Sequence, residues 1–212
     1  MAIVKPQVRT GAYVRNVASG DLVAGGESVT PGALITAGAG TLTAAIITSG
    51  ICVRTGPTGA YTDTTDTASN IIAAIPDCSP GDTFRFRHIN TVAYAMTLAA
   101  GTGVTLGTVP PTTVQASLHK DYLVTVTNNT PTSVAVCNAV TGQKVYTGMT
   151  LAQTSAISVG MLVTGTSVGA SSKVASIQAG VGFTADVNTS GTITLGAITF
   201  SPTVSIDAIS MA

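Results

Sequence analysis

The side chains that could carry out acid–base or nucleophilic chemistry are few and widely spaced. His88 and His119 are the only histidines. A catalytic histidine needs a Ser, Thr or Cys nucleophile within reach and a carboxylate that orients its ring. Neither histidine stands in a motif that supplies these partners. We therefore interpret both as partly buried, hydrogen-bonded rings, and we expect no catalytic residue and no cofactor.

The acidic residues cluster in one part of the sequence. Asp63, Asp66, Asp77 and Asp82 lie within twenty residues of one another. A glycosidase needs two carboxyl groups facing each other across a cleft, and a calcium loop needs several oxygen ligands on one turn. The spacing in TDTTDT is far from an EF-hand pattern, so we assign these aspartates to helix capping and turns and predict no metal site. An alternative, a glycan hydrolase, would depend on Asp63 or Asp66.

The cysteines also give no sign of a reactive or metal-binding site. Cys52, Cys78 and Cys137 are far apart, and no Cys-x-x-Cys pair occurs. An odd number at this spacing fits neither a disulfide framework nor a zinc site. We predict three reduced, buried thiols that pack as small apolar side chains.

Charge is scarce throughout the chain. Charged residues make up 8% of the sequence, against about 25% in a typical soluble protein, and the formal net charge is zero. This balance argues against nucleic-acid binding and against a polybasic membrane surface. No apolar stretch is long enough for a transmembrane helix, and the N-terminal sequence MAIVKPQVRT does not resemble a signal peptide. A charge-poor surface is typical of a protein covered by partners, which points to a component of an assembly.

One segment carries clear helix signals. Residues 66–75 follow Thr65 and Asp66, either of which can act as the N-cap. Ile71, Ile72 and Ile75 fall on one face of a helix, and Pro76 ends it. We predict a single short helix of about ten residues here and no helix beyond residue 143.

Most of the remaining chain has the pattern of β-strands. Residues 83–89 alternate strictly, with Phe84, Phe86 and His88 on one face and two arginines on the other. Residues 121–127 and 204–209 alternate in the same way, and the apolar run at 42–47 also has strand length. The segment 133–140 is expected to form a hairpin with 121–127 across the turn at 128–131. Apolar residues reach 45%, which is enough for a substantial core.

These elements predict an all-β protein with antiparallel, sandwich- or barrel-like domains and one short helix. Residue usage changes near Thr141-Gly142-Gln143, which we interpret as a domain junction. The predicted organisation is an N-terminal arm at 1–20, a main β domain at 21–142 and a smaller β domain at 143–212. Short strands separated by glycines favour a small sandwich or barrel for the last of these.

Two segments resemble proteins of tailed-bacteriophage particles. Residues 50–108 contain the sequences GPT, TDTT and IIAAIP, then GDTFRF, then TLAAGTGVTL, and this series resembles a module that recurs in virion proteins. Residues 158–200 are similar to a second phage-associated pattern through Val159-Gly160-Met161, Phe183-Thr184 and Ile198-Thr199-Phe200. The resemblance carries no catalytic residues.

This resemblance implies a structural virion protein, most similar to a capsid decoration (cement) protein. Such a protein would be made in the host cytoplasm and would bind the outer surface of the shell that the major capsid protein forms, as a homotrimer and with no nucleic acid or membrane as a partner. Within the arm we expect Lys5, Arg9, Tyr13 and Arg15 to contact the capsid. The alternative is a tail- or fibre-associated module that recognises the host or binds glycans.

Overall fold

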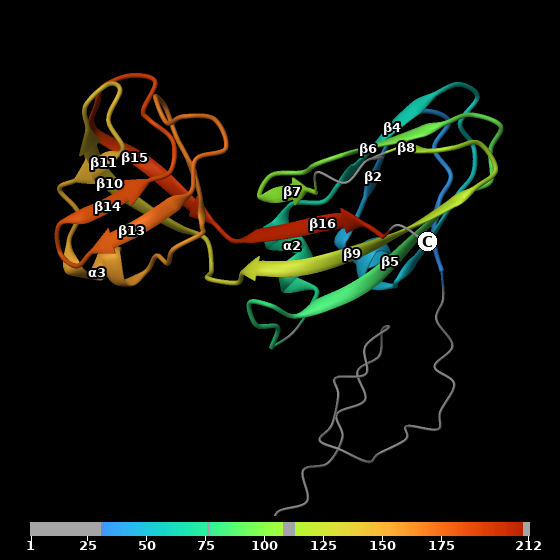
Figure 1. Ribbon diagram of the computed structural model, residues 1–212, viewed down its shortest axis with the longest axis horizontal. Helices are drawn as coiled ribbons and strands as arrows, with labels where there is room; N and C mark the ends of the chain where they lie inside the picture. Colours follow the sequence, from blue (N-terminus) through green and yellow to red (C-terminus); the bar gives the residue numbers. More distant parts are fainter. Residues whose placement is uncertain (1–30, 76, 108–112, 210–212) are drawn as a thin grey trace, which may run out of the picture.

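The computed structural model describes residues 31–75, 77–107 and 113–209, which form two lobes joined by two chain connections (Figure 1). The predicted all-β class is confirmed, with 46% of the described residues in strands and 9% in helices. The two lobes have separate hydrophobic cores. The predicted N-terminal arm at 1–20 lies outside the described residues.

The first lobe is a short β-solenoid, in which successive strands alternate between two facing sheets. Its strands are β1 (Gly32–Leu34), β2 (Gly40–Leu42), β3 (Ile51–Arg54), β4 (Tyr61–Thr65), β5 (Thr83–Asn90), β6 (Met96–Ala99), β7 (Val104–Leu106), β8 (Thr113–Val114), β9 (His119–Asn128) and β16 (Thr203–Ala208). The larger sheet has the order β1-β3-β5-β9-β16-β7, and the smaller sheet has the order β2-β4-β6-β8. Neighbouring strands in the series β1–β3–β5 and in the series β2–β4–β6 run parallel. They do so because each turn of the solenoid takes the chain through the two sheets in the same direction.

Two short helices form the third side of this solenoid. Helix α1 (Ala44–Thr48) follows β2, and helix α2 (Ala68–Ala73) follows β4. Each helix begins after a threonine N-cap, Thr43 or Thr67. The side chain of this threonine accepts a hydrogen bond from the backbone N–H three residues later. The prediction of a strand over 42–47 is therefore wrong beyond Leu42. The predicted helix at 66–75 exists but is shorter, because Thr65 ends β4 and Thr67 is the N-cap.

Asp66 connects the two helices. Its carboxylate accepts hydrogen bonds from the backbone N–H of Ala44 at 2.9 Å and of Thr67 at 2.8 Å. The Asn70 side-chain amide donates a third bond at 2.7 Å. One side chain thus satisfies backbone donors at the N-termini of both α1 and α2, which holds successive turns of the solenoid in register.

Acidification is expected to remove the stability that Asp66 supplies. Partial burial disfavours its charged form, but the hydrogen bonds from Ala44, Asn70 and Thr67 outweigh this and hold its pKa below the usual value of 3.8. Because the folded-state pKa is depressed, the stabilisation is complete above the unfolded-state pKa and is lost as the pH falls through the folded-state value. Urea unfolding from neutral pH to about pH 3 should show the wild-type protein more stable than Asp66→Asn, with the difference narrowing below about pH 4. A constant difference across this range would contradict the assignment.

The second lobe is a six-stranded barrel. Its strands are β10 (Ser133–Ala139), β11 (Val145–Thr147), β12 (Leu162–Thr164), β13 (Val174–Gln178), β14 (Gly182–Ala185) and β15 (Ile193–Ser201), in the order β12-β15-β10-β11-β14-β13. An antiparallel bridge between Leu162 and Lys173 brings the two ends of this sheet together. Tyr146, Phe183 and Phe200 form the centre of its core: Tyr146 and Phe183 stack with ring centroids 4.4 Å apart, and Phe200 packs edge-on against Phe183 at 5.2 Å.

A helix also occurs in the barrel, contrary to the sequence prediction. Helix α3 (Leu151–Ser155) begins with a capping box, in which the Thr150 hydroxyl accepts from the N–H of Gln153 and the Gln153 side chain accepts from the N–H of Thr150. This Thr-x-x-Gln signature is visible in the sequence. The helix is nevertheless not predicted, because its five residues offer too few apolar positions to show helical periodicity.

The barrel is inserted between two neighbouring strands of the solenoid, as Figure 1 shows. Strand β9 leads into it and β16 leaves it, and these strands pair antiparallel. The predicted hairpin between 121–127 and 133–140 is wrong, because β10 pairs with β11 and β15 instead. The predicted junction at 141–143 lies in the turn between β10 and β11. At the observed connection, Asn128 donates to the hydroxyl of Ser158 at 2.7 Å and to the carbonyl of Val159 at 2.8 Å.

The long strands with alternating burial match the strands predicted from the sequence. In β5, Phe84, Phe86 and His88 are buried and Arg85 and Arg87 are exposed. Strand β9 covers the predicted segment 121–127, and β16 buries Val204 and Ile206 on one face.

Candidate functional site

The structure brings several reactive side chains together, but the place where they meet lies inside the solenoid. Arg54 on β3, Asp63 on β4 and His88 on β5 are all completely buried between the two sheets. The Arg54 Nε donates to Asp63 Oδ2 at 3.0 Å, and His88 Nε2 lies 3.4 Å from the same oxygen. Asp63 therefore does not cap a helix or form a turn, as its sequence suggested, but pairs with a buried cation.

The Arg54 guanidinium holds the surrounding backbone as well. It donates to the carbonyls of Leu34 at 3.1 Å and Thr36 at 2.8 Å, and also to the carbonyl of Gly38. These acceptors lie at the end of β1 and in the segment that connects it to β2. A single side chain thus fixes the path of the chain from one sheet to the other, and its charge is matched by Asp63.

Tyr61 and Asn90 extend this polar cluster. The Tyr61 ring lies 4.8 Å from the centre of the Arg54 guanidinium, and its hydroxyl donates to Asn90 Oδ1 at 2.9 Å. The Asn90 amide in turn donates to the carbonyls of Tyr94 at 2.7 Å and Gln115 at 3.1 Å. Every one of these contacts ties strands or connections together, and a cluster at this depth is inaccessible to a dissolved substrate. We interpret it as structural.

The remaining reactive groups do not assemble into a site. His119 is exposed at the start of β9, so the expectation of a partly buried ring is wrong for this residue, and His88 is buried completely.

Across residues 31–75, 77–107 and 113–209, no three His, Cys, Asp or Glu side chains come together as metal ligands. In the same ranges no helix has the length and apolar character to cross a membrane. Lys5, Arg9, Tyr13 and Arg15 lie outside the described residues.

All three cysteines are buried, as predicted, and none of them is in a disulfide. Burial, and then the negative charge of Asp63, raise the pKa of Cys52 to about 12. Burial raises the pKa of Cys137 to about 11. A thiol with such a pKa is protonated at neutral pH and is a poor nucleophile.

The native protein is therefore expected to resist thiol reagents. An alkylating reagent at neutral pH should modify Cys52, Cys78 and Cys137 only as fast as the protein unfolds, because the native environment hides each sulfur. Mass spectrometry after timed alkylation, with and without denaturant, measures this. Rapid labelling of Cys52 in the native protein would show that the solenoid core is open.

The second lobe carries an exposed apolar surface. Val134, Val136, Val140, Val145 and Leu195 are all exposed, and they lie on or beside the adjacent strands β10, β11 and β15. We call these five residues the barrel face. They contain no ionisable group, and Lys144, Lys173 and Asp186 are the only charged residues between positions 133 and 201. A grouped apolar surface of this kind marks an interaction site more often than scattered exposed side chains do.

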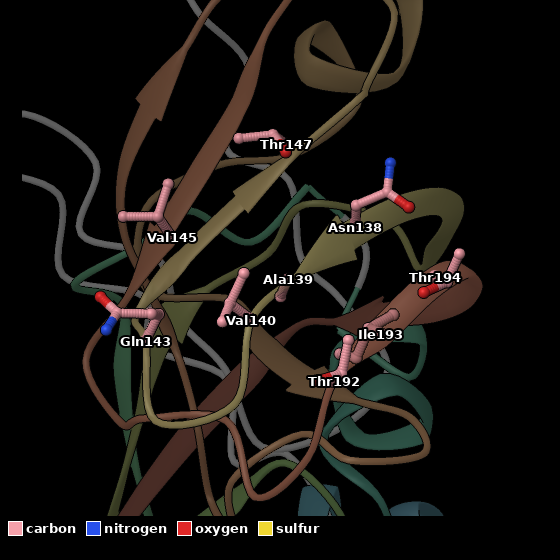
Figure 2. Close-up of a pocket in the computed structure, with 9 residues that line it drawn as sticks. All are labelled: Asn138, Ala139, Val140, Gln143, Val145, Thr147, Thr192, Ile193 and Thr194. Carbon is pink, nitrogen blue, oxygen red and sulfur yellow. The ribbon is translucent and has the colours of Figure 1, made fainter.

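A groove opens beside the barrel face (Figure 2). It has a volume of about 350 Å³. Its lining combines apolar Val140, Val145 and Ile193 with the polar, uncharged Asn138, Gln143 and Thr147. The groove lies between the β10–β11 turn and the start of β15, and its residues come from both. Its composition suits an aliphatic side chain or another uncharged group.

A backbone irregularity places Leu195 next to this groove. The register of β10 and β15 shifts between Cys137 and Ala139, which leaves one extra residue on β15. Leu195 lies in this bulge with a φ of +46° and is 71% exposed, and its N–H donates to the Asn138 side chain at 2.7 Å. A leucine in the left-handed region costs conformational energy, and bulges that redirect a side chain are common at functional sites. The bulge therefore displays an apolar side chain that a regular strand would not.

The outer face of the solenoid differs from the barrel face. Arg85, Arg87, His119 and Asp121 project from β5 and β9 on its surface, and Arg87 forms a two-pronged ion pair with Asp121 at 2.6 and 2.8 Å. The outer face of the solenoid thus carries charged side chains, whereas the five residues of the barrel face carry none. Neither the barrel face nor the groove was predicted from sequence. The one available signal was the low charge beyond residue 133.

Comparison of the chain with protein-family models, with curated proteins and with solved structures finds no match.

Proposed function

We propose that the protein is a structural component of a tailed-phage particle, a capsid decoration protein that binds the outside of the major capsid protein shell and stabilises it. The observation that carries this proposal is the barrel face, an exposed and uncharged apolar surface on a β-barrel. The resemblance of residues 50–108 and 158–200 to phage virion proteins supports it. The polar cluster around Arg54 is consistent with it, because that cluster is buried and supports the fold.

The physical basis of such stabilisation is multivalent binding. A protein that touches several shell subunits makes each contact after the first within one complex, at a high effective concentration. A specific interface buries on the order of 1,600 Å². In the proposal, the N-terminal residues Lys5, Arg9, Tyr13 and Arg15 contact the capsid, and the barrel face is buried against a neighbouring protein of the particle. The resemblance implies a homotrimer.

Binding to empty shells tests this function. Purified protein is mixed with undecorated shells of the phage that encodes it, and the shells are heated with and without the protein. We expect co-sedimentation and a higher temperature of shell disruption. A variant lacking residues 1–16 should fold normally, by circular dichroism, and should no longer bind. Shells that gain no protein and no stability would contradict the proposal, and full binding by the truncated variant would contradict the role of the arm.

A second function, recognition of host glycans by a tail- or fibre-associated module, is favoured by one observation. The groove offers the neutral amides of Asn138 and Gln143 and the hydroxyl of Thr147, which can hydrogen-bond to an uncharged sugar. A glycan array with the wild-type protein and Gln143→Ala distinguishes the two functions. Binding that depends on Gln143 would favour the glycan-binding function.

A further inference from the structure

We infer that residues 12–24 form one more turn of the solenoid, which packs on the free edges of β1 and β2 of the same chain. This inference goes beyond the proposed function and does not depend on it. Three observations carry it: the open end of the solenoid, a sequence repeat with the spacing of a turn, and the alternation of apolar residues in that repeat.

The solenoid is open at the end where β1 and β2 lie. Strand β1 is the first strand of the larger sheet and β2 is the first of the smaller sheet, and no strand among the described residues pairs with their outer edges. A free strand edge presents backbone N–H and C=O groups that can pair with a further strand. The open end therefore fits one additional strand on each sheet.

The hydrophobic core is incomplete at this end. Leu34 and Ala44 pack against the core but are only partly buried. One turn later, Arg54 lies beside Leu34, and Ala68 follows the next threonine N-cap. Both of these residues are completely buried. Since the same positions are covered in the second turn and partly exposed in the first, a further layer on the first turn would complete the core.

The sequence before β1 repeats the sequence of the first turn. GDLVA at 20–24 has the same Gly-x-Leu-x-Ala pattern as GTLTA at 40–44, which forms β2 and leads into α1. The two copies are twenty positions apart, and the observed pairing of β1 with β3 has the same spacing, since Ala33 lies beside Val53. The Ile-Ile pair of α1 has no counterpart in the earlier copy, so the further turn has strands but no helix.

This spacing places apolar side chains over the open core. With twenty positions to a turn, Val14 falls beside Leu34 on the larger sheet, where it covers a side chain that is partly exposed. Leu22 falls beside Leu42 on the smaller sheet, and Leu42 is completely buried. Because side chains alternate between the two faces of a strand, Val14 and Leu22 both face inward.

The outward positions of the proposed turn include two residues expected to contact the capsid. Tyr13 falls beside Ala33 and Arg15 falls beside Ile35, and both of these neighbours are exposed. The side chains of Tyr13 and Arg15 therefore stay on the outer surface while Val14 between them is covered. The further turn thus leaves them accessible to a shell subunit.

The chain itself is the occupant of the open end, because its connection has the right length. In the first turn, ten positions separate Leu42 from Cys52, a residue of the next strand of the larger sheet. Ten positions also separate Leu22 from Gly32, so the proposed turn closes in the same way. A segment tethered this closely is present at a high effective concentration, which favours it over a second copy.

Hydrogen exchange on the full chain tests the inference, with two adjacent apolar residues as variant and control. In the wild type, the amides at 12–14 and 20–22 should be protected. Leu22→Asn removes an inward-facing side chain and should raise their exchange rates about tenfold or more. Val23→Asn makes the same kind of change on the outward face and should leave the rates nearly unchanged. Continued protection of β5 in both variants shows that the rest of the solenoid is folded.

A disulfide across the proposed pairing tests its register. Tyr13→Cys and Ala33→Cys in one chain place two thiols on directly paired residues, within the distance that a disulfide spans. Tyr13→Cys combined with Ile35→Cys is displaced by two residues along the strand and should cross-link more slowly. The native cysteines are buried and do not compete.

The expected results are protection that is lost in Leu22→Asn but kept in Val23→Asn, and a cross-link within one chain. Unprotected amides in these two segments, or equal cross-linking of the two cysteine pairs, would overturn the inference. Linked dimers that form as fast from a mixture of Tyr13→Cys copies and Ala33→Cys copies would also overturn it, and would assign the open end to a second copy. Shell binding is measured separately, so failure of the proposed function leaves these results unchanged.

Discussion

Replacing Asp63 by alanine is expected to destabilise the solenoid by about 3–5 kcal/mol, the cost of leaving one partner of a buried ion pair uncompensated. The Arg54 guanidinium would stay completely buried without its counter-charge, and His88 Nε2 would lose the carboxylate at 3.4 Å. Arg54 also holds the β1–β2 connection through the carbonyls of Leu34 and Thr36, so the loss should spread beyond the site of the change. Urea unfolding monitored by circular dichroism measures it.

The exposed ion pair of the same lobe provides the control. Arg87 and Asp121 make shorter contacts than Arg54 and Asp63, but Arg87 is exposed. Water already solvates the Arg87 guanidinium, which is 45% exposed, although the Asp121 side chain is only 10% exposed, so Asp121→Asn should cost clearly less free energy of unfolding than Asp63→Ala. If Asp63→Ala and Asp121→Asn had similar small effects, the buried pair would not be the support of the solenoid that we describe.

Phe183→Ala is expected to cost about 3–5 kcal/mol, the usual range for removing a buried aromatic ring. Phe183 stacks on Tyr146 and receives the edge of Phe200, so its loss leaves a cavity at the centre of the barrel. Because the two lobes have separate cores, the damage should be confined to one of them.

Hydrogen exchange separates the two lobes. In Phe183→Ala, amide protection should fall in β10 to β15 and persist in β3, β5 and β9. A mutation in the other core, Ile71→Ala, serves as the reciprocal control and should lower protection in the solenoid. Equal loss of protection across both lobes in Phe183→Ala would show that the barrel and the solenoid unfold as one unit.

The parts of the fold that could be predicted from sequence are those set by local alternation. Strand β5 follows directly from Phe84, Phe86 and His88 on alternate positions, and β16 follows from Val204 and Ile206 in the same way. The buried state of the cysteines follows from their spacing and from the lack of metal-binding motifs. In each case the determining residues are neighbours in the chain.

What could not be predicted depends on partners distant in sequence. Strand β10 follows β9 across a turn, yet it pairs with β15, because its partner is chosen by packing in the barrel. Asp63 stands among threonines and other aspartates that suggest capping, and its role appears only when β3 and β5 place Arg54 and His88 against it. Leu195 is exposed because of a bulge, which depends on the register between two strands. The solenoid itself left a trace in the sequence, since Thr43-Ala44 and Thr67-Ala68 each precede an Ile-Ile pair, and this short repeat marks α1 and α2.

The location and copy number of the protein in intact particles test the central claim most directly. Quantitative mass spectrometry of purified virions, combined with antibody labelling in electron micrographs, gives both quantities. The proposed function predicts several hundred copies distributed over the outer surface of the shell. A few copies at a single vertex would place the protein in the tail or a fibre, and its absence from the particle would contradict a structural role altogether.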